Sequence, residues 1–299
     1  MLRTRFAALM LTAAVAAGAL ETAAAGDAAA PAVEATAPAA KTGYADVNGL
    51  HMYYEVRGEG QPTLVLHGAY MSADSMASAT VPLSRTRQVI AIDLQGHGRT
   101  ADIDRPITYE DMADDVAALM DKIGVSQVDV FGYSMGAGVA YQLAIRHPAK
   151  VRRLAAASGT YKTEGMYPEL VQMIGTLTAA SFAGSPFEAE YKRLAPKPEN
   201  FPLLVEKLKT LDVTPQDWPA DAIRDIKAPT LVISGDADVI RPEHSLEIFR
   251  LRGGGPSPDF MSAPANAQLA VLPGTSHIGV LMDRADLVVA FVSEFFDKK

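Results

Sequence analysis

Three residues whose side chains can together perform nucleophilic catalysis occur along the chain in the order serine, aspartate, histidine. The serine, Ser134, stands in a G-x-S-x-G sequence that begins at Gly132 and directly follows the apolar run 128–131. A strand that turns sharply into a helix at such a sequence exposes the serine hydroxyl, because the flanking glycines have no Cβ atoms to clash in the turn. The sequence therefore predicts that Ser134 is a nucleophile at the end of a buried strand.

A histidine follows the last apolar run of the chain. His277 lies shortly after the run 269–272. An imidazole can take the proton of a serine hydroxyl and later return it to the leaving group. Because the runs before Ser134 and His277 both have the pattern of buried parallel strands, their carboxyl ends are expected at the same edge of the sheet. We therefore expect His277 to be the base.

Two aspartates are candidates for the third member of this group. Asp236 and Asp238 both follow the apolar run 231–233, just past the carboxyl end of a predicted strand. A carboxylate at this edge would orient the imidazole and stabilise the imidazolium ion. The alternative role for either acid is to cap the turn by accepting hydrogen bonds from loop N–H groups. Their positions alone do not separate the two.

The composition excludes several other kinds of chemistry. The chain has 299 residues and no cysteine, so it can have no disulfide, thiolate metal ligand or cysteine nucleophile. Its 27 Lys and Arg residues against 35 Asp and Glu residues give a net charge of −8, which does not favour a nucleic-acid partner. No metal-ligand spacing, P-loop or dinucleotide-binding glycine pattern occurs, so we expect neither a metal nor another cofactor.

The amino-terminal residues resemble a targeting segment. Arg3 and Arg5 precede the apolar stretch 6–20, and the small residues up to Ala25 fit a cleavage site. We predict that residues 1–25 are a cleavable signal peptide, that the protein is secreted or periplasmic, and that the mature chain has no membrane span. An uncleaved anchor is the alternative. Residues 26–41 contain few large apolar side chains, and we interpret them as a flexible tether.

The remaining residues alternate between strand-like and helix-like patterns. A pair of strands is predicted around the turn Asn48-Gly49, and six short apolar runs follow it. These runs are 63–66, 89–92, 128–131, 154–157, 231–233 and 269–272. Helices are expected at 109–123, 134–147, 242–250 and 284–296. The alternation predicts an α/β fold with a mostly parallel, eight-stranded, doubly wound sheet.

One long segment interrupts the alternation. Residues 160–224 have no strand-like run and several helical segments broken by prolines, so we predict an inserted helical cap between core segments 42–159 and 225–299. The alternative is an additional helical layer with no role at the site. A Gly- and Pro-rich segment, 252–268, is expected to be a surface loop.

The sequence from about residue 44 to 297 resembles the α/β-hydrolase superfamily, particularly its smaller serine esterases, cofactor-free perhydrolases and carbon–carbon bond hydrolases. The G-x-S-x-G elbow and the order of serine, acid and histidine carry this resemblance. In that family the catalytic acid stands three residues after the glycine that ends the strand, which implies Asp238 rather than Asp236. A serine nucleophile at the elbow argues against the haloalkane dehalogenases and epoxide hydrolases, which use a carboxylate.

The resemblance also implies an oxyanion hole and a substrate pocket. The donors would be the backbone N–H groups of Met135 and of Ala69, which follows a His67-Gly68 pair like that of the family. His67 itself would be structural. We expect an apolar pocket lined by Tyr70 and Met71 and, from the cap, by Met166, Tyr167, Met173 and Phe182. The alternative is that the cap residues form the core of the cap.

These observations favour a serine hydrolase that cleaves a small or medium apolar carboxylic ester, or a related carbonyl compound, through an acyl-enzyme on Ser134. The alternatives are a carbon–carbon bond hydrolase or perhydrolase with the same three residues, and a homologue that binds a ligand without catalysis. The sequence specifies neither the acyl group nor the oligomeric state.

Overall fold

A computed structural model describes residues 38–255, 261–262 and 266–298. The predicted signal peptide, 1–25, and most of the predicted tether lie outside these residues. Strand β1 begins at Lys41, one residue inside the predicted tether, because Lys41 pairs with Val56 across the first hairpin. No helix of the described residues is long and apolar enough to cross a membrane.

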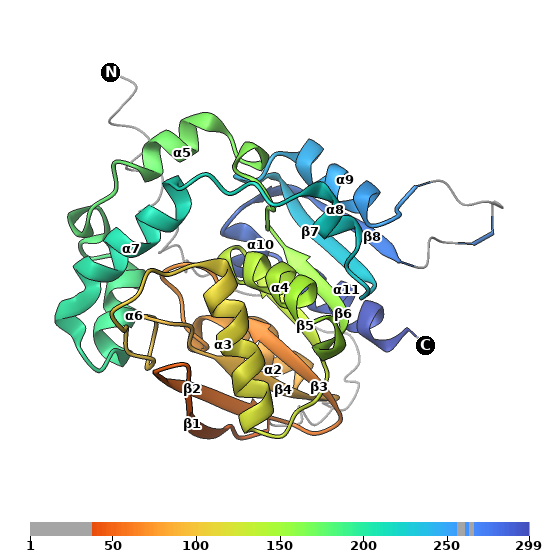
Figure 1. The fold of residues 1–299 in the computed structure, drawn as a ribbon. Helices are drawn as coiled ribbons and strands as arrows, with labels where there is room; N and C mark the ends of the chain where they lie inside the picture. Colours follow the sequence, from red (N-terminus) through yellow and green to blue (C-terminus); the bar gives the residue numbers. More distant parts are fainter. Residues whose placement is uncertain (1–37, 256–260, 263–265, 299) are drawn as a thin grey trace, which may run out of the picture. The chain divides into compact units, whose positions relative to one another are not determined.

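Eight strands form one sheet in the order β1-β2-β4-β3-β5-β6-β7-β8 (Figure 1). The strands β1 and β2 and the pair β2 and β4 are antiparallel, and every other pair is parallel. The bounds are β1 Lys41–Val47, β2 Leu50–Arg57, β3 Gln61–Leu66, β4 Arg87–Ile92, β5 Val128–Tyr133, β6 Val151–Ala157, β7 Thr230–Ala237 and β8 Ala267–Ser276. The predicted mostly parallel, eight-stranded sheet is therefore confirmed.

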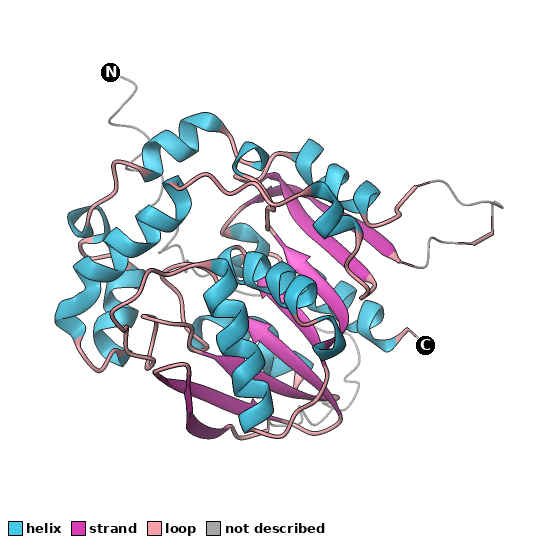
Figure 2. Cartoon of the chain, viewed as in Figure 1, coloured by secondary structure: helices cyan, strands magenta, loops and turns pink. Residues whose placement is uncertain are grey.

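Helices cover both faces of the sheet (Figure 2). The bounds of those around the sheet are α2 Ala77–Leu83, α3 Tyr109–Lys122, α4 Met135–Arg146, α8 Ala220–Arg224, α9 Pro242–Leu251, α10 Gly279–Met282 and α11 Ala285–Asp297. Adjacent strand residues face opposite layers: Leu64 packs in the core with α3 and α4, whereas Val65 packs in the core with α2 and α11. The near-continuous apolar runs reflect this burial on both faces.

Helix α2 has no counterpart among the predicted helices. Its sequence, Ala77–Leu83, contains Pro82 and mostly small residues, so it shows no clear apolar periodicity. The single turn α10 (Gly279–Met282) has none either, whereas α3, α4, α9 and α11 agree with the predicted segments within a few residues. Helix α4 begins at Met135 rather than Ser134, because Ser134 has a positive φ.

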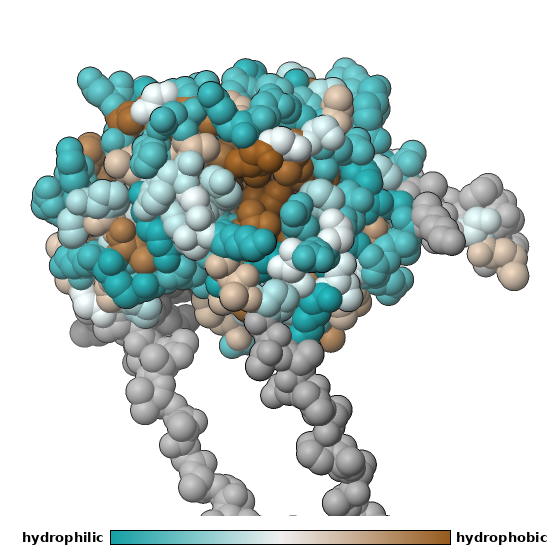
Figure 3. All heavy atoms as spheres, turned by 90° about the horizontal axis from the view of Figure 1, so that it is seen from below, coloured by the Kyte–Doolittle hydropathy of each residue, from teal (hydrophilic) through white to brown (hydrophobic). Residues whose placement is uncertain are grey.

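Residues 160–224 contain the helices α5 (Pro168–Ile174), α6 (Pro186–Leu194) and α7 (Phe201–Val213), short 3₁₀ turns, and α8. All of them lie between β6 and β7. Phe201, Leu204, Val205 and Leu208 of α7 are buried in the core cluster that also contains α3 and α4. On the face shown in Figure 3, hydrophobic residues gather in one band bordered by hydrophilic residues.

Candidate active site

The turn between β5 and α4 holds Ser134 in a conformation that few residues adopt. Its φ is 53° and its ψ is −120°. A Cβ at Gly132 would lie 2.3 Å from the carbonyl oxygen of Gly136, and a Cβ at Gly136 would lie 2.3 Å from that of Leu66. Only glycine fits at both flanking positions, so the backbone can fold tightly and leave the Ser134 side chain partly exposed.

Ser134, His277 and Asp238 form a chain of hydrogen bonds. The Ser134 Oγ lies 2.9 Å from His277 Nε2, and His277 Nδ1 lies 2.7 Å from Asp238 Oδ1. The His277 side chain is 18% exposed and that of Asp238 is fully buried. With Nδ1 donating to the carboxylate, Nε2 is free to accept the serine proton.

The environment of Asp238 favours its charged form. Burial alone would raise the pKa of this carboxyl, but the hydrogen bond and charge of His277 and the hydrogen bond from Ser158 lower it below the usual value. Ser158 Oγ donates to Oδ2 at 2.6 Å, and the Ile240 N–H donates to Oδ1 at 3.2 Å. The Gly235 N–H also donates to Oδ2, at 3.3 Å. With His277, Ser158 and Ile240, four described groups therefore donate hydrogen bonds to this one carboxylate.

Asp236 lies on the exposed side of the same strand end. It accepts the N–H of Thr275 at 3.1 Å, and the pKa of its carboxyl is lowered by hydrogen bonds from the backbone of Gly274 and Thr275. It makes no contact with His277 among the described hydrogen bonds. The structure therefore brings Asp238, and not Asp236, to the imidazole.

The loop after β3 lies against the turn that carries Ser134: a Cβ at Gly136 would lie 2.7 Å from the His67 carbonyl oxygen, and a Cβ at Gly68 would lie 3.1 Å from the Tyr133 ring. The backbone N–H groups of Ala69, in this loop, and of Met135, at the start of α4, donate no hydrogen bond to any described residue. Both are the N–H groups expected to bind an oxyanion. His67 links this loop to the residues after β4: its Nδ1–H donates to the Gly68 carbonyl at 2.8 Å, and its Nε2 accepts the Leu94 N–H at 3.1 Å. Burial lowers the pKa of His67, so the neutral imidazole can fill both roles.

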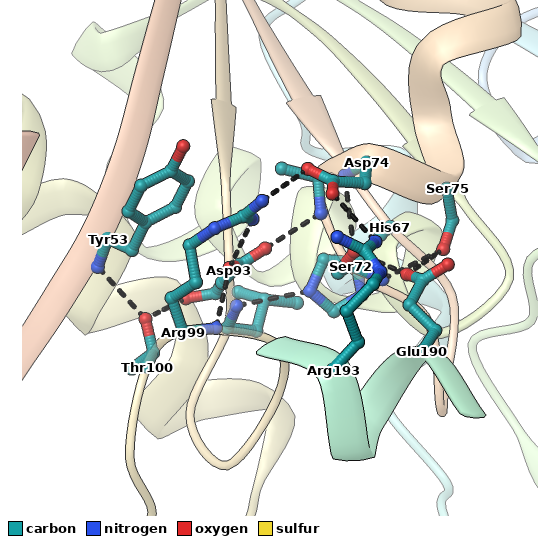
Figure 4. Close-up of polar contacts among 12 residues, drawn as sticks. Tyr53, His67, Ser72, Asp74, Ser75, Asp93, Arg99, Thr100, Glu190 and Arg193 are labelled. Carbon is teal, nitrogen blue, oxygen red and sulfur yellow. Dashed lines mark hydrogen bonds and ion pairs between the residues drawn. The ribbon is translucent and has the colours of Figure 1, made fainter. Parts of the chain in front are cut away.

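A polar network secures the same loop to the neighbouring strand end (Figure 4). The buried Asp93 accepts the N–H of Ala73 and that of Arg99, both at 2.7 Å. The Arg99 guanidinium reaches Asp74 at 2.7 Å. The turn that contains Asp93 thereby fixes residues 73 and 74, on the carboxyl side of the loop that carries Ala69.

Helix α6 of the inserted segment joins this network through Glu190 and Arg193 (Figure 4). Glu190 accepts hydrogen bonds from the hydroxyls of Ser72 and Ser75, and Arg193 pairs with Asp74 at 2.9 Å. One face of α6 is therefore bound to the loop that follows β3.

The predicted pocket residues are distributed over different environments. The rings of Tyr70 and Phe182 are in contact, with centroids 4.5 Å apart and an angle of 41° between their planes. Met71 is 5% exposed and packs with Phe131 and Tyr133 in the core on the α2 and α11 side of the sheet. Tyr167 is 42% exposed.

The other two residues of that prediction, Met166 and Met173, are partly buried. Met166 forms an isolated bridge with Ile240, two residues after Asp238, and Met173 lies near the end of α5.

Two residues at the site were not singled out from the sequence. They are Ser158, whose hydroxyl donates a hydrogen bond to Asp238, and Tyr133, whose hydroxyl donates to the His277 carbonyl at 2.9 Å. Ser158 follows β6 at the same sheet edge as Ser134, a position that could have identified it. Among the described residues, no group of three or more His, Asp or Glu side chains is arranged to hold a metal ion.

Comparisons with known proteins agree with this architecture. The sequence profile of the Alpha/beta hydrolase family matches residues 63–291. A dihydrolipoyllysine-residue acetyltransferase component of an acetoin cleaving system, from Cupriavidus necator, is 38% identical over 116 residues. That match covers 38% of this chain and only 31% of the relative.

Two further similarities extend over more of the chain. A 2-hydroxymuconate semialdehyde hydrolase from Pseudomonas sp. (strain CF600) is 29% identical over 206 residues, which is 62% of this chain and 73% of the relative. A solved structure of an N-acyl homoserine lactone degrading enzyme has a TM-score of 0.65 and 25% sequence identity, and the match covers 85% of this chain and all of that one (100%).

Proposed function

The chain belongs to the Alpha/beta hydrolase family, and from that premise we propose that it is a serine hydrolase that cleaves a small or medium carboxylic ester through an acyl-enzyme on Ser134. The observation that carries this proposal is the hydrogen-bonded chain from Ser134 through His277 to Asp238, with spacings of 2.9 and 2.7 Å. The strained backbone of Ser134 adds support, because strain of this kind is concentrated at functional sites.

In the first half of the reaction, Ser134 Oγ attacks the ester carbonyl carbon while its proton passes to His277 Nε2. The carbonyl oxygen becomes an oxyanion, which the N–H groups of Ala69 and Met135 would stabilise. The carbon–oxygen bond to the alcohol then breaks, and the imidazolium gives its proton to the departing alkoxide. Asp238 stabilises the imidazolium throughout and keeps its own charge.

In the second half, water replaces the alcohol. His277 takes a proton from water, the resulting hydroxide attacks the acyl carbon, and the acid leaves as Ser134 recovers its proton from His277. The products are one alcohol and one carboxylic acid, and the enzyme is unchanged.

The test is hydrolysis of p-nitrophenyl acetate and butyrate by the wild type and by Ser134→Ala. We expect activity in the wild type and its loss in the variant, whereas Ser78→Ala, a change at an exposed serine of α2, should retain activity. A fluorophosphonate should label the wild type on Ser134. Binding of esters without turnover would favour a ligand-binding protein, and an adduct on another serine of active protein would contradict the assignment.

A carbon–carbon bond hydrolase is the second candidate. The similarity to a 2-hydroxymuconate semialdehyde hydrolase favours it. Turnover of 2-hydroxymuconate semialdehyde with a kcat/KM above that of every simple ester and lactone tested would establish this candidate in place of the first.

We also propose that residues 1–25 are removed as a signal peptide, which would place the mature protein in the periplasm or outside the cell. Support comes from the basic residues before the apolar stretch 6–20 and the small residues after it. Sequencing the amino terminus of protein recovered from the periplasm of a Gram-negative host should find Gly26 first. A chain that begins at Met1 in the membrane fraction would indicate an anchor.

A further inference from the structure

An aspartate interrupts the apolar face of helix α7. Phe201, Val205 and Leu208 are buried, and they lie on one side of the helix because they are separated by four and three residues. Asp212, four residues after Leu208, continues this row and is partly buried. A carboxyl group therefore points in the same direction as the apolar side chains that attach α7 to the core.

Three groups from three other parts of the chain interact electrostatically with Asp212. They are Tyr70 in the loop after β3, Tyr109 at the start of α3, and His277 after β8. Phe201, in the same row of α7 as Asp212, packs against Phe182, whose ring packs against Tyr70, with centroids 5.9 and 4.5 Å apart, so this face of α7 is turned toward the loop after β3. The charge of Asp212 also acts on His277, which is hydrogen-bonded to Ser134.

No ion pair neutralises Asp212 within the described part of the chain. The lysines of its own helix are engaged elsewhere: Lys207 pairs with Asp102 at 2.6 Å and Lys209 with Glu206 at 2.5 Å. Burial raises the pKa of Asp212 to about 7, while the charge of His277 acts to lower it. Near neutral pH, a large share of this side chain is thus the uncharged carboxylic acid, which can donate a hydrogen bond.

Tyr70 supplies a second polar group with no partner. Its hydroxyl is buried and makes no hydrogen bond with the described residues. The ring is held against Phe182 at 4.5 Å and Phe187 at 6.5 Å between centroids, and the backbone has a φ of 63°. A bulky residue with positive φ and a buried, unsatisfied hydroxyl is costly, which is typical of a group reserved for a ligand.

We propose that Asp212 and Tyr70 form a polar subsite beside Ser134, in which the Asp212 carboxylic acid donates a hydrogen bond to an uncharged oxygen acceptor of the substrate. The inference rests on the proposed ester hydrolysis and narrows its substrate class. The preferred substrates are uncharged esters that carry a second acceptor, such as a keto or amide oxygen. Substrates with a carboxylate are disfavoured, increasingly so as Asp212 ionises.

Three ethyl esters of nearly equal size test the subsite: ethyl pentanoate, ethyl 4-oxopentanoate and monoethyl succinate. The second differs from the first by a keto oxygen, and the third places a carboxylate where the second has a methyl ketone. Hydrolysis is followed by proton release between pH 6 and pH 8 in the wild type, Asp212→Asn, Asp212→Leu and the control Asp217→Asn, an exposed acid of the same inserted segment. Ratios of kcat/KM cancel the ionisation of His277, which all substrates share.

At pH 6 the wild type should prefer the oxo ester to ethyl pentanoate by about fivefold, as expected for one hydrogen bond of about 1 kcal/mol. Asp212→Asn should keep this preference at every pH, since an amide can donate, and Asp212→Leu should lose it. From pH 6 to pH 8, kcat/KM for monoethyl succinate relative to ethyl pentanoate should fall in the wild type and the control, but not in Asp212→Asn.

Equal ratios in all four proteins, with Ser134-dependent turnover intact, would overturn the subsite and leave the proposed function standing. Absence of turnover of these three esters and of the p-nitrophenyl esters by the wild type would refute both. If Asp212→Leu does not fold, the pH dependence of the wild type against Asp212→Asn decides alone.

Discussion

At the scale of single residues, the two acids after β7 have different environments although they are only two positions apart. Asp238 is buried and bonded to His277 Nδ1, whereas Asp236 is exposed and caps the turn at Thr275. Regular strand alternation would place side chains two positions apart on the same side, but the register of β7 shifts between Gly235 and Ala237 and the strand ends at Ala237, so the chain has turned before Asp238.

This contrast gives a direct prediction. Asp238→Asn should lower kcat by a factor on the order of 10⁴ while the protein remains folded, because an amide can stabilise the wrong tautomer of His277. Asp236→Asn, the matched control, should stay close to the wild type. Steady-state kinetics with circular dichroism on both variants checks this. A greater loss from Asp236→Asn in folded protein would contradict the role given to Asp238.

At the scale of elements, the order of strands explains why the site residues meet. Strands β5, β6, β7 and β8 are consecutive neighbours in the sheet and parallel, so the residues that follow them reach one edge. Ser134, Ser158, Asp238 and His277 follow these four strands in turn. The last two strands were recognisable from their apolar runs, which is why the sequence indicated the positions of the acid and the histidine.

Helix α6 is the element that binds the inserted segment to the loop of Ala69. We predict that Glu190→Ala lowers the free energy of unfolding by about 1 to 3 kcal/mol, because the hydroxyls of Ser72 and Ser75 lose their shared acceptor. It should also lower kcat, since the loop that carries Ala69 is then less firmly held. Chemical unfolding and ester kinetics measure the two effects.

Lys192→Ala is the matched control, since Lys192 is an exposed residue of the same helix that pairs with Glu188. We expect it to change neither kcat nor the unfolding midpoint noticeably. Equal effects from the two variants would show that the contact of α6 with the loop has no special importance.

At the scale of the whole molecule, burial of titratable groups should determine how stability changes with pH. The pKa of Asp212 is raised to about 7 by burial, so the folded state keeps a proton that the unfolded chain loses near pH 4. Stability from this group is therefore complete below about pH 4 and is lost as the pH rises to about 7. Burial of His67 and His97 acts in the opposite direction: it lowers both pKa values, that of His97 to about 3, and costs stability as the pH falls below about 6.5.

Asp212→Asn should remove only the first of these effects. We predict that its free energy of unfolding, relative to the wild type, increases from pH 5 to pH 7 by at most about 1.4 kcal/mol per pH unit and is constant above pH 8. Urea unfolding of both proteins at several pH values provides the comparison. Parallel pH profiles would mean that Asp212 ionises as it does in the unfolded chain.

The sequence by itself determined the sheet, most of its helices, Ser134 and His277, and it limited the acid to Asp236 or Asp238, because these depend on local patterns: apolar runs, turn glycines and positions just after strands. The helix α2 escaped, since Pro82 and small residues obscure its period. Only the tertiary structure decided that Asp238 is the acid that contacts His277, and that Ser158 donates a hydrogen bond to Asp238. It also showed that Met71 packs in the core on the α2 and α11 side of the sheet. The same is true of Asp212, which precedes His277 by 65 positions in the sequence. Only the packing of the inserted helices brings Asp212 near enough to His277 for their charges to interact. Contacts between residues so far apart depend on how whole elements pack, and no local pattern records that.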